Sequence, residues 1–146
     1  MEIQLKVIDF GSEEWKKAVS LREEILRIPL GSTSSKAELE EERNHFQMTA
    51  SIDGQIVGTA VMVPESSKVK VQRVAVDEKV RNLGIGGRLM NFCERYALER
   101  LEAKSMYCHA RNTAVKFYHD LGYLPSGDYF DEDGIPHLYM EKRLAT

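Results

Sequence analysis

Alternating hydrophobic and polar positions predict most of the strands of this chain. Ile3, Leu5 and Val7 alternate with polar residues, as in a strand with one buried face. Later in the chain, Asp53–Gly54 is a hairpin turn signal, and Pro64 should end the return strand that follows it. The predicted strands lie at 3–7, 46–52, 56–63, 68–76, 106–110, 123–130 and 135–142. Short turns join the second to the fourth of these, which predicts an antiparallel meander.

Two helices are predicted between the first strand and the meander. Ser12 is a suitable N-cap for a helix whose apolar residues follow helical spacing, and Pro29 should stop that helix. Ser35 and Glu38 have the spacing of a capping box for a short helix at 36–43. We expect most of the acidic run Glu38–Glu42 of this second helix to be a solvated face.

Helical spacing returns twice in the second half of the chain, at 85–97 and at 114–121. Asn112 is the expected N-cap of the last helix, and Gly122 suits the position just after its end. The final two strands should be joined by a hairpin turn at Asp131–Gly134.

The resulting order is β-α-α-β-β-β-α-β-α-β-β. The succession of strand, helix and strand from 68 to 110 implies a right-handed crossover with parallel pairing of 68–76 and 106–110. The other strands are joined by short turns, so the pattern predicts an α/β chain, of α+β character, with a mixed sheet. A length of 146 residues fits one domain, 1–146, with a real core.

Composition narrows the function classes. The net charge of −3 shows no basic excess of the kind that nucleic-acid binders usually carry. No apolar run approaches the roughly 20 residues that span a bilayer, and the first residues lack a signal-peptide core. The two cysteines, Cys93 and Cys108, have no metal-binding spacing and suggest a reducing compartment. We therefore expect a cytoplasmic protein that binds neither nucleic acid nor membrane, and both a monomer and a homodimer fit the pattern.

The glycine-rich turn after the strand at 68–76 is the main candidate site. Strand, glycine turn and helix start make an anion site, because glycine lets backbone N–H groups approach a phosphate and the helix dipole attracts it. Arg81 and Arg88 add positive charge at the same end. The competing interpretation is that these glycines only allow a helix to pack closely.

The turn differs from two common phosphate loops. It lacks the lysine of a nucleotide P-loop, and Leu89 stands where a dinucleotide fingerprint needs its third glycine. The remaining pattern, Arg81-x-x-Gly84-x-Gly86, resembles the loop with which GCN5-related N-acetyltransferases (GNAT) grip the pyrophosphate of acetyl-CoA. On this resemblance the loop residues that bind the co-substrate are Arg81, Asn82, Leu83, Gly84, Ile85, Gly86, Gly87 and Arg88.

A second segment carries the same resemblance. Ala114-x-x-Phe117-Tyr118-x-x-Leu121-Gly122-Tyr123 is similar to the A-x-x-F-Y-x-x-L-G-F segment of the family, and the element order is that of the GNAT fold. The segments Leu21–Glu24 and Asp131–His137 further resemble the ElaA/YjcF-type predicted acyltransferases. The resemblance implies a splay between the strands at 68–76 and 106–110 that holds the pantetheine arm.

The resemblance also implies roles for single residues. In the splay, the backbone of Val74, Ala75 and Val76 would bind the acetyl-CoA arm, and Ala114, Phe117 and Tyr118 would contact the same co-substrate. Tyr118 would be the general acid that protonates the departing thiolate, although a core aromatic residue would fit the same helical spacing. The family often has asparagine where this chain has Arg111, so Arg111 is expected to reach a phosphate or an acceptor carboxylate instead.

The remaining polar groups give no single general base. The candidates are His45, His109, His137, Glu132 and Asp133. Cys108 as an acyl-carrying nucleophile is a minor alternative, and no metal is expected because the histidines and cysteines lack ligand spacing. The segments Ile28–Ser35 and Asp128–His137 would frame the acceptor site, and the acidic residues of the second segment would suit a cationic amine.

These observations predict an acetyltransferase that moves an acetyl group from acetyl-CoA directly to a primary amine in a ternary complex. The acceptor would be a small molecule or a peptide. The main rival is a non-catalytic acyl-CoA sensor on the same fold, which would keep the glycine turn and have no need of Tyr118. An unrelated phosphate-binding or interaction domain is a second rival.

Overall fold

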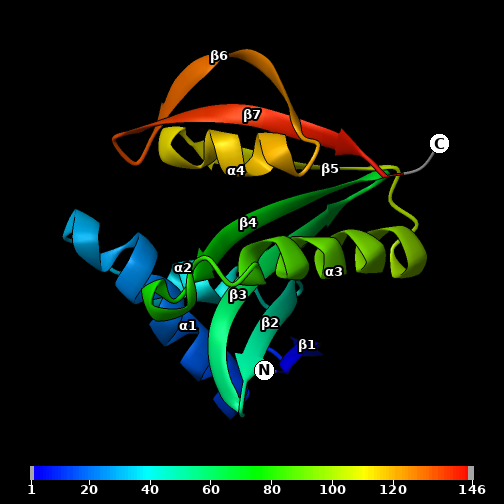
Figure 1. Cartoon of the computed structure of the whole chain (residues 1–146). Helices are drawn as coiled ribbons and strands as arrows, with labels where there is room; N and C mark the ends of the chain where they lie inside the picture. The colour runs from blue at the N-terminus through cyan, green and yellow to red at the C-terminus, as the bar shows by residue number, and fades with distance from the viewer. Residues whose placement is uncertain (1, 145–146) are drawn as a thin grey trace. The chain divides into compact units, whose positions relative to one another are not determined.

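The structure is a computed structural model that describes residues 2–144 (Figure 1). Its elements in chain order are β1 (Ile3–Ile8), α1 (Glu13–Leu26), η1 (Ile28–Leu30), α2 (Lys36–Glu40), β2 (Phe46–Ile52), β3 (Gln55–Glu65), β4 (Lys68–Val76), η2 (Glu78–Val80), α3 (Ile85–Arg100), β5 (Ser105–Arg111), η3 (Asn112–Ala114), α4 (Val115–Asp120), β6 (Leu124–Glu132) and β7 (Ile135–Arg143). The elements labelled η are short 3-10 helices. The predicted order of strands and α-helices is confirmed.

The strands form a seven-stranded sheet in the order β1-β2-β3-β4-β5-β7-β6. The pairing of β4 with β5 is parallel, whereas β1 with β2, β2 with β3, β5 with β7 and β6 with β7 are antiparallel. The α+β class with a mixed sheet is therefore confirmed. By its contacts the chain divides into two compact units, and each is described by itself below.

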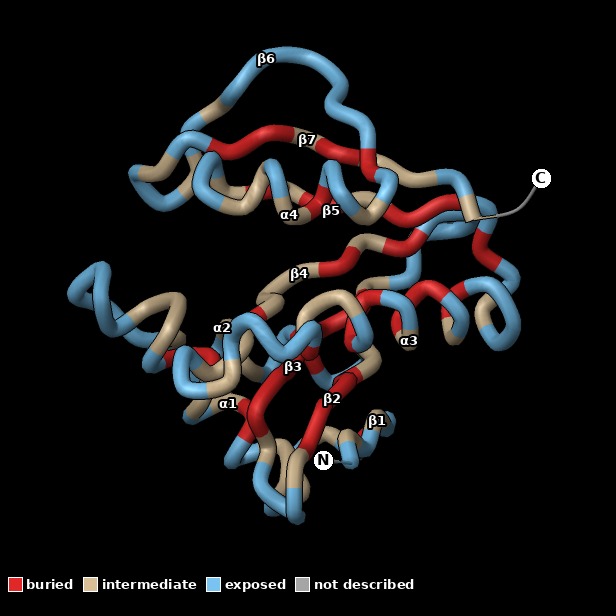
Figure 2. The backbone as a smooth tube through the Cα atoms, viewed as in Figure 1, coloured by how far each residue is buried: buried red, intermediate tan, exposed pale blue. Residues whose placement is uncertain are grey.

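The first unit contains the residues up to Val63 together with Arg73–Cys93. Figure 2 shows β2 and β3 buried along most of their length, on both faces. Polar residues of β2 are buried with its apolar ones, and Thr49, for example, is 0% exposed. The start of α3 packs closely here, because a Cβ on Gly58 would lie 3.5 Å from side-chain atoms of both Ile85 and Leu89. A distance of 3.5 Å is an ordinary van der Waals contact, so α3 packs against β3 here without a steric requirement for glycine.

The second unit contains Pro64–Gln72 and the residues from Glu94 onwards. The parallel ladder joins Lys68–Lys70 of β4 to Ser105–Tyr107 of β5, and β5 pairs with β7 along its whole length. One face of these strands is apolar and buried, with Met106, Cys108, Ala110, Leu138 and Met140 all at most 6% exposed. The strict alternation places the polar and aromatic side chains of β5 and β7 on the opposite face.

Several predicted boundaries are wrong. The predicted helix at 36–43 ends at Glu40, because its last turn tightens into i to i+3 hydrogen bonds, such as Glu42 N–H to Leu39 O. Pro64 does not end β3, which continues to Glu65, since the fixed φ of proline is compatible with extended backbone and Pro64 lies beyond Met62, the last β3 residue paired with β2. Asn112 lies in η3 and makes no side-chain cap, and α4 begins only at Val115.

The turns follow their predicted chemistry more closely. The capping box of Ser35 and Glu38 is present, and Gly122 has the left-handed φ of 100° expected after α4. The last hairpin turn is shorter than predicted, because only Asp133 and Gly134 have positive φ, 55° and 78°. Two consecutive left-handed residues match the right-handed twist of the flanking strands.

Candidate functional site

The glycine-rich turn begins with a short 3-10 helix that fixes its entry from β4. The Asp77 N–H donates a 2.8 Å hydrogen bond to Val57 O, and Asp77 Oδ1 accepts a hydrogen bond of 3.0 Å from the Lys79 N–H. Arg81 Nε donates to Val76 O at 3.3 Å. The Arg81 side chain is therefore held against the end of the strand, with its guanidinium group half in solvent.

The turn then enters α3 through left-handed backbone. Asn82 and Gly84 have φ values of 78° and 76°. Gly84 O accepts the first helical hydrogen bond, 3.1 Å from the Arg88 N–H. The first turn of α3, Ile85–Arg88, contains no acidic residue. A carboxylate partner of the turn is Glu78, whose Oε1 lies 3.6 Å from Arg81 Nη1.

Burial divides the predicted loop residues into three groups. Ile85 is 1% exposed and is a core residue, so only its backbone remains available to a ligand. Gly86 and Gly87 are half-buried in the same helical turn. The remaining loop residues are exposed to solvent: Arg81, Asn82, Leu83, Gly84 and Arg88. A Cβ on Gly84 would meet no atom within 4 Å, so Gly84 is favoured by its left-handed φ and not by close packing. The phosphate-binding role of the turn stays a prediction.

The predicted arm-binding residues lie at the end of β4. Ala75 is 4% exposed, while Val74 and Val76 are half-buried. The residue before them, Arg73, has a φ of 52°, which breaks the extended conformation of the strand. Such a φ is uncommon for a residue other than glycine, and in β4 it re-aims the peptide groups that follow.

The predicted residues of the second unit lie at the end of β5 and along η3 and α4. Arg111 is half-buried at the last position of β5, and Ala114 ends η3. Tyr118 is 7% exposed, with its ring edge-to-face against Phe117 at 5.0 Å and against Tyr123 at 5.7 Å. The Tyr118 ring is thus part of an aromatic core. This packing does not test the predicted general-acid role of its hydroxyl.

Among the candidate bases, His109 and Glu132 are brought together. His109 Nδ1 lies 3.0 Å from Glu132 Oε2, and the imidazole and the Phe130 ring meet in a T-shaped contact with centroids 5.1 Å apart. His137 is 7% exposed, and its Nδ1 lies 2.8 Å from the Ile135 carbonyl. Asp133 is placed in the tip of the hairpin turn. His45 belongs to the first unit, where its Nδ1 is buried without a hydrogen-bond partner.

The comparisons with known proteins agree with this geometry. A family model described as an acetyltransferase (GNAT) domain matches residues 15–144. The uncharacterized N-acetyltransferase YjcF of Bacillus subtilis is 30% identical over 138 residues, which cover 93% of this chain and 97% of YjcF.

This chain belongs to the acetyltransferase (GNAT) family.

Two further likenesses refine the family assignment. The ElaA protein of Escherichia coli is 30% identical over 76 residues, covering 52% of this chain and 50% of ElaA. The structure of a GNAT acetyltransferase from Elizabethkingia anophelis with acetyl-CoA bound has a TM-score of 0.73 and 18% identity, covering 97% of each chain. This GNAT protein is ElaA/YjcF-like, and it is an acetyl-CoA-dependent N-acetyltransferase.

Two expected absences can be compared with the structure only over residues 2–144. In that range no group of three or more His, Cys, Asp or Glu side chains is arranged to hold a metal ion. None of the helices in the same range is long and apolar enough to cross a membrane. The cytoplasmic location stays a prediction.

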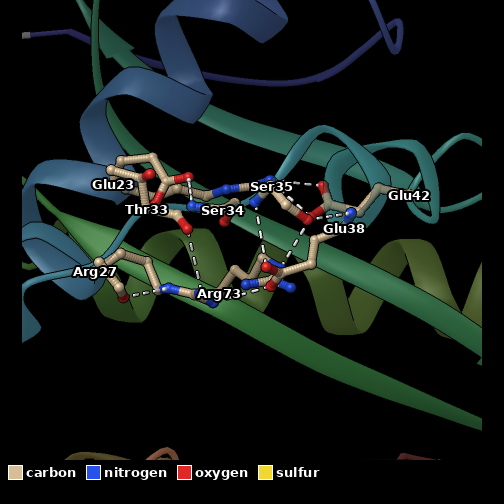
Figure 3. A network of polar contacts seen from close by, with 10 residues as sticks. Glu23, Arg27, Thr33, Ser34, Ser35, Glu38, Glu42 and Arg73 are labelled. Carbon is tan, nitrogen blue, oxygen red and sulfur yellow. Dashed lines mark hydrogen bonds and ion pairs between the residues drawn. The ribbon is translucent and has the colours of Figure 1, made fainter.

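Within the acidic run of the second helix of this GNAT acetyltransferase, Glu42 departs from the predicted solvated face. Glu42 is 1% exposed and pairs with two arginines, Arg22 and Arg73. Figure 3 labels Glu42 and Arg73. The chain turns back after α2 and carries this carboxylate inward, whereas Glu40 and Glu41 stay exposed. No local signal distinguishes Glu42 from its neighbours, because its partners are 20 and 31 residues away.

A second polar network was also missed. On the polar face of β5 and β7, the rings of Tyr107 and Tyr139 stack at 5.0 Å. Tyr139 donates a 2.5 Å hydrogen bond to Glu141, which also accepts one of 3.1 Å from Lys68. The hydrogen bond from Tyr139 lowers the pKa of Glu141, and the Glu141 carboxylate raises the pKa of Lys68. The period of 2 along each strand could have indicated the shared face, but the pairing of strands was needed to find the partners.

Proposed function

We propose that this acetyltransferase binds the pyrophosphate of acetyl-CoA at Arg81–Gly87 and transfers the acetyl group directly to a primary amine. The observation that carries the proposal is the start of α3. There, left-handed backbone at Asn82 and Gly84 leads into a helix N-terminus with exposed Arg81 and Arg88 and no acidic residue in its first turn. Backbone N–H groups, the helix dipole and two guanidinium groups would together neutralise a pyrophosphate.

The rest of the co-substrate would be held mainly by backbone. In this proposal the peptide groups of Val74, Ala75 and Val76 bind the pantetheine arm, and an N–H there polarises the thioester carbonyl. Small apolar side chains suit such a role, because only the backbone has to be reached. From the second unit we propose contacts of Arg111, Ala114 and Phe117 with acetyl-CoA. The two units would then work as one domain, 1–146.

Direct transfer from acetyl-CoA to the amine needs a ternary complex of enzyme, acetyl-CoA and acceptor. The amine nitrogen attacks the thioester carbonyl, the carbon–sulfur bond breaks, and the thiolate takes a proton from Tyr118. Burial raises the pKa of the Cys108 thiol to about 12, which supports direct transfer because only a thiolate could carry the acetyl group. His109, oriented by Glu132, is our proposal for the group that accepts the proton of the amine.

The acceptor is proposed to be a cationic amine, small or peptidic, at the segments Ile28–Ser35 and Asp128–His137. Asp128, Asp131 and Asp133 are exposed in the second segment and would attract a positive charge.

A broad panel of amines with acetyl-CoA, followed by release of free CoA thiol, tests the proposed function. We expect turnover with at least one cationic amine. Tight CoA binding without turnover on any amine would favour the acyl-CoA sensor, and no CoA binding at all would favour an unrelated phosphate-binding domain.

A further inference from the structure

The most deeply buried charges in the described part of the chain are Arg22 of α1 and Glu42, which follows α2. Each is 1% exposed. Arg22 Nη2 donates to both carboxylate oxygens of Glu42 at 2.7 Å. The pair joins two segments that lie 20 residues apart in the sequence.

Glu42 also binds Arg73, as Figure 3 shows. Arg73 Nε lies 2.9 Å from Glu42 Oε2, and the contact is an ion pair rather than an aligned hydrogen bond. The Arg73 side chain is 24% exposed, so most of it is buried against the same carboxylate. One buried glutamate therefore holds two arginines, one on a helix and one on β4.

The backbone conformation of Arg73 suggests what its ion pair with Glu42 does. Arg73 is left-handed, with a φ of 52°, inside a strand whose other residues are extended. Residues with a side chain adopt this conformation only where the surroundings enforce it. Because one left-handed residue changes the direction of the next peptide groups, the state of Arg73 decides where the N–H groups of Val74–Val76 point.

We propose that Glu42, itself fixed by Arg22, is a positioning residue that locks Arg73 in its left-handed conformation and thereby aims the Val74–Val76 backbone at acyl-CoA. This inference rests on the proposed function for its ligand. A buried ion pair is a poor means of adding stability, since apolar residues of the same volume often do as well. In this proposal the Glu42 ion pair instead specifies one backbone conformation at Arg73.

Two substitutions at one position separate positioning from direct contact. Arg73→Gly and Arg73→Ala both remove the side chain, but only glycine adopts positive φ without strain. We expect Arg73→Ala to weaken CoA binding by about tenfold or more, while Arg73→Gly binds within a few-fold of the wild type, as measured by calorimetry. Asp53, with a φ of 51° in the β2–β3 turn, gives the matched control. Asp53→Gly and Asp53→Ala should differ in stability and not in CoA affinity.

A double-mutant cycle tests whether Glu42 acts through Arg73. Glu42→Gln alone should weaken CoA binding, but added to Arg73→Gly it should cause little further loss, because the residue that it holds has already been replaced. Amide hydrogen exchange of Val74–Val76 in the free protein gives a readout that needs no ligand. We expect faster exchange in Glu42→Gln and Arg73→Ala than in Arg73→Gly.

The outcomes separate this inference from the proposed function. Wild-type protein that does not bind CoA would contradict the proposed function. The amide exchange of Val74–Val76 would still show whether Glu42 positions Arg73. The positioning role is overturned if Arg73→Gly and Arg73→Ala show equal amide exchange at Val74–Val76 and equal affinity for CoA. Equal affinity at the wild-type level would make the cluster merely structural, and an equal loss would mean that the Arg73 side chain touches the ligand.

Discussion

Tyr123 donates a 2.8 Å hydrogen bond to Glu94, a carboxylate that also accepts one of 2.9 Å from Lys142. Tyr123 is 0% exposed, and burial together with Glu94 raises the pKa of its phenol. The network thus joins Tyr123, which follows the turn after α4, to Glu94 of α3 and Lys142 of β7. Tyr123 stands where the family segment that begins at Ala114 has phenylalanine, and its added hydroxyl donates to the buried Glu94 carboxylate.

Removal of this hydroxyl should therefore destabilise the protein. We predict that Tyr123→Phe lowers the free energy of unfolding by about 1.5–3 kcal/mol, because a charged acceptor loses one of its buried donors. Urea unfolding measures the change, and Tyr129→Phe is the control, since Tyr129 is 54% exposed. Equal stability of the two variants would show that Lys142 alone satisfies Glu94.

The hydroxyl of Tyr118 should matter for turnover instead. If Tyr118 is the general acid, Tyr118→Phe should lower turnover by about ten- to a thousandfold, near the range of proton-transfer catalysis. CoA affinity and melting temperature should change little, because the buried ring that packs against Phe117 and Tyr123 is kept. A variant with normal turnover and a lowered melting temperature would make the hydroxyl structural.

Cys108 should take no part in the transfer. With a thiol pKa of about 12, it stays protonated at working pH and is a poor nucleophile. We predict intersecting initial-rate plots for acetyl-CoA and acceptor, no acetyl adduct on the protein by mass spectrometry, and retained turnover in Cys108→Ala. An acetylated Cys108 that passes its group to the acceptor would contradict direct transfer.

The Glu141 network should make stability depend on pH in a defined window. The folded pKa of Glu141 lies below its usual 4.5, so its contribution is present above that value and is lost as pH falls through the folded pKa. The folded pKa of Lys68 lies above 10.5, so its contribution is present below that value and is lost as pH rises through the folded pKa.

The window can be checked with one substitution. Glu141→Gln should be less stable than the wild type near pH 7, and the difference should shrink below about pH 4 and above about pH 11, as followed by urea unfolding. The exposed Glu99→Gln should show no such window. A difference that keeps its pH 7 size as the pH is lowered to about 2 would mean that the Glu141 charge adds nothing in the fold.

The sequence predicted the elements of this GNAT protein well, because alternation, helical spacing and turn residues are local signals. Asp53–Gly54 and Ser35 with Glu38 formed the predicted structures. Long-range charge pairing was not predictable. Nothing near Glu42 marks it as buried, and the left-handed φ of Arg73 has no signature in a valine-rich strand.

The candidate site was predictable in part for the same reason. The glycine turn is a local pattern, and Gly84 has the left-handed backbone that such a turn requires. His109 and Glu132 were named singly as bases, but their contact depends on β6 and β7 returning beside β5. Pairing of distant strands is decided by the packing of the whole sheet, which no single stretch of sequence reports.

The most direct test of this account is the affinity of Gly86→Asp for CoA, measured by calorimetry. An aspartate in the first turn of α3 complements the helix dipole, so the free protein should fold at least as stably as the wild type. The same carboxylate adds bulk and negative charge where the pyrophosphate is proposed to lie, so CoA affinity should fall by about a hundredfold or more. A folded Gly86→Asp protein that binds CoA as tightly as the wild type would contradict the assignment of the pyrophosphate site to Arg81–Gly87.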